Sequence, residues 1–149
     1  KVANEDDVKK NWEALKLKEG KSSVLEGVPK SLPAMVKANR IQDKVAGVGF
    51  DWDGDEAVFE KIEEELQELN VEVKNKSSRV DEEFGDVLFS LINYARFLEV
   101  NPEDALEKTN KKFIKRFQYI EQKARQEGKR IENLDITEME AYWQEAKGL

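Results

Sequence analysis

The chain has 149 residues, of which 39% are hydrophobic and 38% charged, and its formal net charge is −7. This length and composition predict one helical domain, and the acidic balance argues against nucleic acid as a partner. Because the sequence contains neither cysteine nor histidine, disulfides, thiolate or histidine metal sites and Ser-His-Asp catalysis are excluded, which leaves carboxylates as metal ligands and general bases.

The hydropathy and the first residues of the sequence indicate where in the cell the protein is expected. The sequence has no run of about 18 apolar residues, and it does not open with a signal peptide. We therefore expect a cytoplasmic protein with no membrane partner. The sequence starts at Lys1 rather than Met, as a fragment of a longer protein would.

Two helices are predicted in the first third of the chain. Residues 4–19 have an amphipathic pattern, and a loop rich in Gly and Pro separates them from a second helix that starts near Pro33 and stops at Gly47. In the turn that follows, Phe50 and Trp52 either anchor the turn in the core or form a wall for a nucleobase. Both interpretations stay open.

Two acidic helices, 62–73 and 80–98, are the centre of the predicted organisation. At about 100° per residue, each carries an apolar stripe with a polar, mostly acidic flank. The apolar stripes are Val58, Ile62, Leu66, Leu69 and Val73, then Phe84, Val87, Leu88, Leu91, Ala95 and Leu98. The flanks are Lys61, Glu65, Glu68 and Glu72, then Glu83, Asp86, Ser90 and Asn93. A short turn makes the helices antiparallel neighbours, which places both flanks at the edge of a shared core.

Four carboxylates on these flanks are candidate metal ligands: Glu65, Glu68, Glu83 and Asp86. Like charges one turn apart repel each other by about 0.2–0.5 kcal/mol per pair. Placing two such pairs opposite each other on neighbouring helices therefore does not stabilise the fold. A divalent cation reverses this balance, because Mg²⁺ prefers oxygen ligands and can also hold substrate phosphates. Acidic runs are also typical of solvated helix faces, and spacing alone leaves that interpretation open.

A fifth helix is predicted from Asn101-Pro102 to about Gln126. It carries Lys112 and Arg116 on one flank of an apolar stripe, where two cations could meet phosphates held by metal ions. The stripe consists of Leu106, Phe113, Phe117 and Ile120.

A last short helix is predicted at about 137–147, after a polar loop. Thr137 and Glu140 have the spacing of a capping box for it. The apolar faces of the fourth and fifth helices are wider than one chain of this size can bury, which favours self-association.

The carboxylate pattern resembles that of a known family. Glu64-Glu65-Leu66-Gln67-Glu68, fourteen further residues and then Glu83-Phe84-Gly85-Asp86 are similar to the EExxE…ExxD signature of the all-α nucleoside triphosphate pyrophosphohydrolases. More narrowly, residues 27–52 (GVPKSLPAMVKANRIQDKVAGVGFDW) and 110–117 (NKKFIKRF) resemble the C-terminal half of MazG proteins. The resemblance covers most of the chain.

The resemblance implies an all-α helical bundle whose core is completed by homodimerisation. It implies a single domain over residues 1–149, with its core at about 33–126. It also implies hydrolysis of nucleoside triphosphates to the monophosphate and pyrophosphate, with Mg²⁺ as cofactor and Mn²⁺ as a substitute. Full-length MazG proteins carry two such domains, and this sequence has one.

Individual residues match the motifs of that family. Glu65, Glu68, Glu83 and Asp86 match the metal ligands. Lys112 and Arg116 match the basic residues that approach the phosphates, and Trp143 resembles a late tryptophan that lines the base pocket.

The expected mechanism combines these carboxylates and cations. Mg²⁺ would bridge the triphosphate and polarise a water molecule, while Lys112 and Arg116 stabilise the charge of the transition state. Lys61 is expected to bind substrate, and Glu64 or a metal ligand to orient or deprotonate the water. The base is expected to be held by stacking, which predicts broad base acceptance.

Two alternatives remain from the sequence. Pyrophosphohydrolases specialised for dUTP, dCTP or phosphoribosyl-ATP share the carboxylate motif and differ in the pocket. A non-enzymatic acidic helical dimerisation module would use the carboxylates only as a solvated face.

Overall fold

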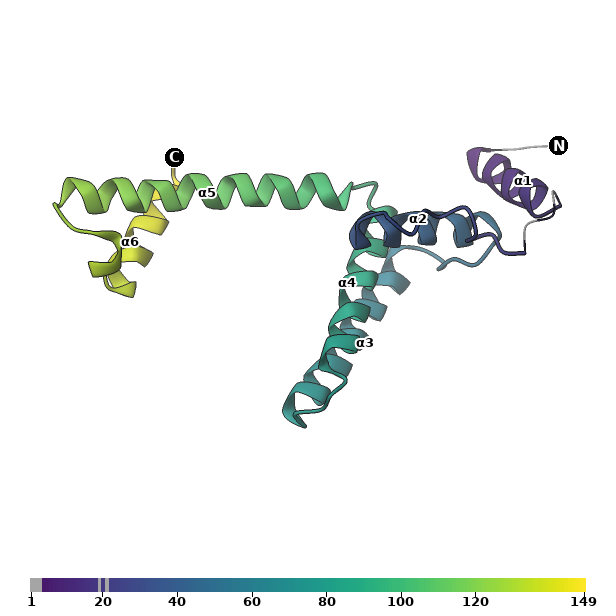
Figure 1. Ribbon diagram of the computed structural model, residues 1–149, viewed down its shortest axis with the longest axis horizontal. Coiled ribbons are helices and arrows are strands. Elements are labelled where there is room, and N and C mark those ends of the chain that lie inside the picture. The colour runs from purple at the N-terminus through teal and green to yellow at the C-terminus, as the bar shows by residue number, and fades with distance from the viewer. Residues whose placement is uncertain (1–3, 19, 21) are drawn as a thin grey trace. The chain divides into compact units, whose positions relative to one another are not determined.

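The computed structural model describes residues 4–18, 20 and 22–149 (Figure 1). All regular structure among these residues is helical, which confirms the all-α prediction. The elements are α1 (Glu5–Lys18), α2 (Ala34–Gly47), α3 (Asp55–Lys74), α4 (Val80–Phe97), α5 (Pro102–Gln126), the short 3₁₀ helix η1 (Ile131–Asn133) and α6 (Ile136–Lys147). None of the helices described combines the length and the apolarity that a membrane span requires.

The chain divides into two compact units, Lys1–Pro102 and Glu103–Leu149. The first unit contains α1 to α4, and the second contains α6 and almost all of α5. That the whole sequence forms a single domain stays a prediction.

The hairpin of α3 and α4 is the largest helix contact of the first unit (Figure 1). Acidic residues fill the first turn of both helices, where they interact favourably with the positive end of the helix dipole. The N-caps of α2, α3 and α4 are Pro33, Gly54 and Arg79, and none of them makes a side-chain cap hydrogen bond. These helices therefore depend on packing more than on capping.

The contact between α3 and α4 differs from the predicted apolar seam. Val58, Ile62 and Val87 are buried there as predicted, but so are Glu65 and Glu83. Six predicted core residues are instead exposed or half-exposed, and we call them the open apolar face. They are Leu66, Val73, Phe84, Leu88, Leu91 and Leu98. The apolar arc of each helix is wider than one neighbour can cover, so the hairpin packs along the border between the apolar and acidic sides.

The loop between α2 and α3 is fixed at several points. Gly49 and Gly54 adopt φ values of 93° and 101°, in a region that L side chains rarely enter, so both positions require glycine. Between them, the carboxylate of Asp51 accepts two hydrogen bonds from the Arg96 guanidinium of α4, at 3.0 and 2.5 Å. The side chain of Gln42 on α2 donates to the carbonyl oxygen of residue 89 on α4 at 2.9 Å.

In the second unit, α6 folds back beside the C-terminal part of α5 (Figure 1). Ile120, Ala124 and Leu134 form its buried core. Four partly buried residues pack against this core, namely Ile131, Met139, Tyr142 and Trp143.

The capping box of α6 lies two residues before the predicted one. Asp135 accepts the backbone N–H of Glu138 at 2.8 Å, and the Glu138 carboxylate accepts the N–H of Asp135 at 3.0 Å. The box predicted at Thr137 and Glu140 was wrong, because the helix starts at Ile136. The hydrogen bond from Lys129, at 2.6 Å, and that from the Asp135 backbone hold the pKa of Glu138 below its usual value.

We expect the substitution Asp135→Ala to destabilise the second unit by about 1 kcal/mol, as loss of an N-cap usually does. Urea unfolding followed by circular dichroism would measure this change. Glu140→Ala, on the exposed side of the same helix, is the control and should stay within about 0.5 kcal/mol of the parent. Equal unfolding midpoints for the two variants would contradict the role assigned to Asp135.

Candidate metal and substrate site

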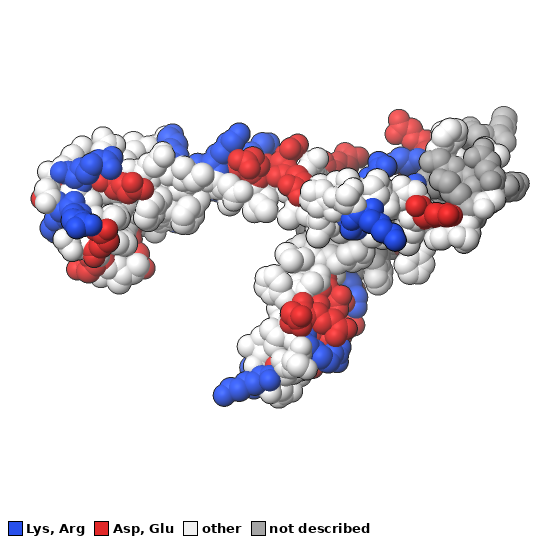
Figure 2. Space-filling model, viewed as in Figure 1, with Lys and Arg blue, Asp and Glu red and all other residues white. Residues whose placement is uncertain are grey.

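Three of the four predicted metal ligands meet on the α3–α4 hairpin. Glu65, Glu83 and Asp86 each offer a carboxylate oxygen, and these oxygens lie within 4.8 Å of one another. Glu65 and Glu83 are only 7% and 3% exposed, whereas Asp86 is exposed and opens the cluster to solvent. Figure 2 shows acidic side chains gathered on this hairpin beside an uncharged surface. The arrangement offers hard oxygen ligands to a divalent cation.

The fourth predicted ligand, Glu68, lies outside this group of three. It is exposed on α3, one turn after Glu65. Its negative charge nevertheless acts on Glu83, because it helps to raise the pKa of that residue. Glu68 therefore borders the cluster.

Each buried carboxylate has a cation from its own helix or cap. Lys61 Nζ lies 2.6 Å from Glu65 Oε1 and 3.2 Å from Glu64 Oε2. Arg79 Nη2 lies 2.7 Å from Glu83 Oε1. Lys61 was among the predicted site residues, but Arg79 was missed. Its spacing of four residues before Glu83 was the signal that could have identified it.

The environment of Glu83 disfavours its negative charge. Burial raises the pKa of Glu83, and the neighbouring carboxylates Glu68, Asp86 and Glu82 raise it further, while Arg79 opposes them. Glu83 Oε2 is buried and receives no hydrogen bond from the residues that the structure describes. A buried anionic oxygen without a donor is destabilising. A divalent cation would compensate this charge, so the donor set fits a metal ion.

The remaining predicted residues lie at less enclosed positions. Glu64 has a side chain that is 57% exposed and contacts Lys61. Lys112 is exposed on α5, and Arg116 is half-buried one turn later. The Arg116 guanidinium lies 5.6 Å from the centre of the Trp143 ring, which brings these two predicted residues together in the second unit.

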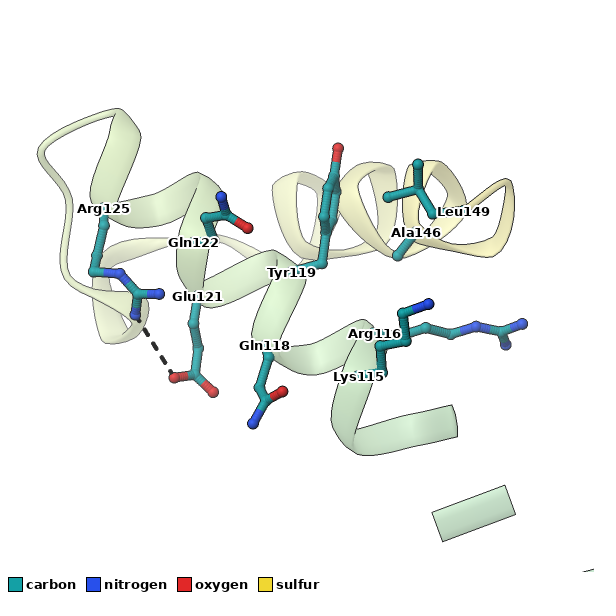
Figure 3. A pocket seen from close by; sticks show the side chains of 9 residues that line it. All are labelled: Lys115, Arg116, Gln118, Tyr119, Glu121, Gln122, Arg125, Ala146 and Leu149. Atoms are coloured by element: carbon teal, nitrogen blue, oxygen red, sulfur yellow. Dashed lines mark ion pairs between the residues drawn. The ribbon is translucent and has the colours of Figure 1, made fainter. Parts of the chain in front are cut away.

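A groove of about 510 Å³ lies between α5 and the C-terminal end of α6 in the second unit, where Ala146 and Leu149 line it (Figure 3). Arg116 lines it together with Lys115, Tyr119 and the ion pair of Arg125 with Glu121, whose charged atoms are 4.0 Å apart. The groove mixes cations, amides and a carboxylate. It therefore has no single chemical character that would define a ligand.

A second, more apolar pocket of about 320 Å³ lies in the first unit. Its lining residues are Ile41, Gln42, Val45, Phe50, Asp51, Trp52, Phe89 and Asn93. Phe50 is 79% exposed and Trp52 47% exposed, so neither is buried as an anchor of the turn. The same helix, α4, supplies residues to this pocket and to the carboxylate cluster.

The substitution Glu83→Gln should raise the melting temperature of the protein in EDTA at pH 7, because it removes a charge that burial and neighbouring carboxylates disfavour. A raised pKa means that this penalty is present at high pH and disappears as the pH falls through that pKa. The advantage of the variant should therefore shrink toward acidic pH. Loss of the ion pair with Glu83 should cost Arg79 little stability in this variant, because the Arg79 side chain is 58% exposed and water can solvate its charge.

The same melting experiment tests the cation. Mg²⁺ should stabilise the parent, because a ligand of the native state stabilises it, and this shift should be absent in Glu83→Gln. Glu63→Gln, an exposed neighbour on α3, should behave like the parent. A Mg²⁺ shift that survives in Glu83→Gln would exclude Glu83 as a ligand.

Comparisons with known proteins identify one family. Residues 54–120 match the model of a family described as the MazG nucleotide pyrophosphohydrolase domain. The chain is 45% identical over 142 residues to the nucleoside triphosphate pyrophosphohydrolase/pyrophosphatase MazG of Thermotoga maritima, covering 93% of this chain and 55% of that protein. It is 36% identical over 151 residues to the nucleoside triphosphate pyrophosphohydrolase of Escherichia coli K12. This match covers 97% of this chain and 57% of that protein.

A further relative has no assigned activity in its name. The chain is 45% identical over 152 residues to the uncharacterized protein YabN of Bacillus subtilis, covering 99% of this chain and 31% of that protein. The chain thus spans little more than half the length of the first two relatives and about a third of YabN.

Proposed function

Since the chain belongs to the MazG nucleotide pyrophosphohydrolase family through residues 54–120, we propose that it hydrolyses nucleoside triphosphates to nucleoside monophosphates and pyrophosphate. The observation that carries this proposal is the meeting of Glu65, Glu83 and Asp86 within 4.8 Å. Two of these carboxylates, Glu65 and Glu83, are buried, and the repulsion among all three has no structural benefit, so the group suits a cation that binds phosphates.

Mg²⁺ is the proposed ion, with Mn²⁺ as a substitute, because all available ligands are hard carboxylate oxygens. Glu65, Glu83 and Asp86 would hold it, and Glu68 would complete the set from the border of the cluster. When bound, the ion would neutralise charge on the triphosphate and lower the pKa of a water molecule.

Lys61 and Arg79 are proposed to bind substrate phosphates. Both now neutralise carboxylates of the cluster, at 2.6 and 2.7 Å. A metal ion on Glu65 and Glu83 would take over that neutralisation, which would leave the ammonium and guanidinium groups to donate hydrogen bonds to phosphate oxygens. The site would thus exchange internal ion pairs for contacts with the substrate.

Three further residues complete the proposed substrate-binding set. Lys112 and Arg116 would supply fixed positive charge to the phosphoryl oxygens in the transition state. Trp143 would hold the Arg116 guanidinium against its ring by a cation–π contact and would itself contact the nucleotide. Glu64, beside Lys61, is the proposed residue that orients or deprotonates the attacking water.

A homodimer is proposed to cover the open apolar face. Phe84 is 55% exposed, Leu66 48% and Leu91 45%, so the two packed helices α3 and α4 both present apolar surface to solvent. Such surfaces on single chains mark interaction sites. A second copy presents the same self-complementary face through a two-fold axis, so it is the simplest partner.

The function is tested by measuring release of pyrophosphate from the eight common NTPs and dNTPs, with Mg²⁺ and with EDTA. We expect Mg²⁺-dependent pyrophosphate and monophosphate from several bases. Glu83→Gln and Asp86→Asn should each lower turnover at least about 100-fold, since a metal ligand contributes several kcal/mol to the transition state. Glu63→Gln is the matched control and should keep full activity.

Each other result points elsewhere. Free phosphate as the product would indicate a different hydrolase. A strong preference for dUTP or dCTP would favour a specialised pyrophosphohydrolase, and a folded protein without any turnover would favour the dimerisation module.

The dimer is tested by sedimentation of Leu91→Arg. A charge at the centre of the open apolar face should convert a dimeric parent into monomers, because a buried unpaired charge is strongly unfavourable. Glu60→Arg, exposed on the side of α3 opposite its apolar stripe, should remain dimeric. A dimeric Leu91→Arg variant would place the interface elsewhere.

A further inference from the structure

We propose that a row of three side chains on α5 sets the position of α6, and through it the contact between Trp143 and Arg116. The row consists of Tyr119, Lys123 and Glu127, and we call it the α5 row. This inference rests on the proposed function, in which Trp143 and Arg116 bind the nucleotide. It adds three positioning residues, which act on the substrate through α6 and do not touch it themselves.

The α5 row lies on the face of α5 that packs against α6. At about 100° per residue, its three side chains fall within about 80° of one another, and Arg116 falls inside the same arc. The core residues Ile120 and Ala124 of the second unit border this arc. One face of α5 therefore carries both a proposed phosphate-binding cation and the contacts that hold α6.

Each member of the α5 row contacts α6. The Tyr119 hydroxyl donates to Glu145 Oε2 at 2.8 Å, and Figure 3 shows the Tyr119 ring beside α6. Lys123 Nζ lies 3.6 Å from the same oxygen and 6.0 Å from the centre of the Tyr142 ring. The Tyr142 hydroxyl donates to Glu127 Oε1. The helix α6 is therefore held at two of its residues, Tyr142 and Glu145.

These two residues flank Trp143 in the sequence, since Tyr142 precedes it and Glu145 follows it by two residues. On a helix, Glu145 and Trp143 are about 160° apart and lie on opposite borders of the face that Tyr142 turns toward α5. The helix α6 cannot rotate about its own axis without breaking the contacts of Tyr142 and Glu145. The α5 row therefore determines how closely the Trp143 ring approaches Arg116, which is now 5.6 Å away.

The ring contacts of Trp143 do not fix its position by themselves. The Phe113 ring lies 5.0 Å from the Trp143 ring at an interplanar angle of 54°, and Phe113 is 55% exposed. Aromatic pairs and cation–π contacts are favourable over a wide range of distances and angles. Hydrogen bonds depend more steeply on geometry. The bonds of the α5 row therefore define the position of α6 more narrowly than the ring contacts do.

The charge of Lys123 persists at neutral pH. The Tyr119 hydroxyl and the negative charge of Glu145 raise the pKa of Lys123, so the ion pair is present throughout the usual range of an enzyme assay. The side chains of Lys123 and Glu145 are 33% and 50% exposed, and ion pairs at such positions contribute little to stability. Variants of the α5 row should therefore stay folded, and their effects should reflect the position of α6.

The kinetic test uses Tyr119→Phe and Lys123→Met, which keep most of the side-chain volume. In each variant KM for ATP should rise about threefold to fivefold, a part of the value of one contact between a base and an aromatic ring. In a Trp143→Ala background neither substitution should raise KM further, because the α5 row acts through that ring. An unchanged KM in both variants would overturn the inference, and so would an equal further rise in the Trp143→Ala background.

Two controls separate position from charge and from stability. Arg125→Met removes the same charge from the other side of α5, where Arg125 pairs with Glu121 at 4.0 Å. Asp135→Ala weakens the start of α6 and leaves the α5 row intact. Both should keep the KM of the parent. If Asp135→Ala raised KM as much as Lys123→Met, loss of stability would account for the effect and the α5 row would have no positioning role.

Fluorine NMR of the protein labelled with 5-fluorotryptophan tests the inference without turnover. The chain has three tryptophans, and the signal of Trp143 is the one that Trp143→Ala lacks. This signal should shift in Lys123→Met and stay in place in Arg125→Met. A shifted signal without pyrophosphate release from the parent would overturn the proposed hydrolysis and keep the α5 row. Pyrophosphate release together with an unshifted signal in Lys123→Met would overturn the α5 row and keep the hydrolysis.

Discussion

The first unit depends on how two carboxylates are accommodated between α3 and α4. Glu65 and Glu83 lie where a hairpin of this kind would otherwise bury apolar side chains. Lys61 and Arg79 neutralise them, but each cation comes from four residues away along the same chain segment. These ion pairs therefore compensate charge without linking one helix to the other. A divalent cation shared by the two carboxylates would do both, so its binding would also link α3 to α4.

The position of the carboxylates also explains the open apolar face. Turning the acidic border of each helix into the contact rotates part of its apolar stripe outward. Leu66 on α3 and Leu91 on α4 are exposed for this reason. One packing choice thus creates both a polar site inside the hairpin and an apolar surface on it. A fold that buried the whole apolar stripe within one chain would have left the carboxylates in solvent and too dispersed to hold an ion.

Periodicity predicted which helices exist and which residues share a face. Periodicity did not give the rotation of each helix about its own axis, because this rotation depends on how much of the apolar arc one neighbouring helix can cover. The burial of Glu83 was missed for this reason. The burial of Gln42 was missed because its side chain is held by a hydrogen bond to Phe89, 47 positions away. The position of Trp143 beside Arg116 likewise depends on tertiary folding. Helical spacing placed the four candidate carboxylates on two flanks, but it left open whether they bind a metal ion or form a solvated face. The similarity to the family motif favoured the metal site.

The uncapped starts of α2, α3 and α4 determine where the protein can be engineered. Gly54 cannot be replaced without backbone strain, and Arg79 is committed to Glu83. Pro33 has φ −53° and ψ 142°, an extended conformation that serine or aspartate adopts readily at an N-cap. A thermostabilised variant that retains the site would therefore begin at the start of α2, far along the chain from the carboxylates.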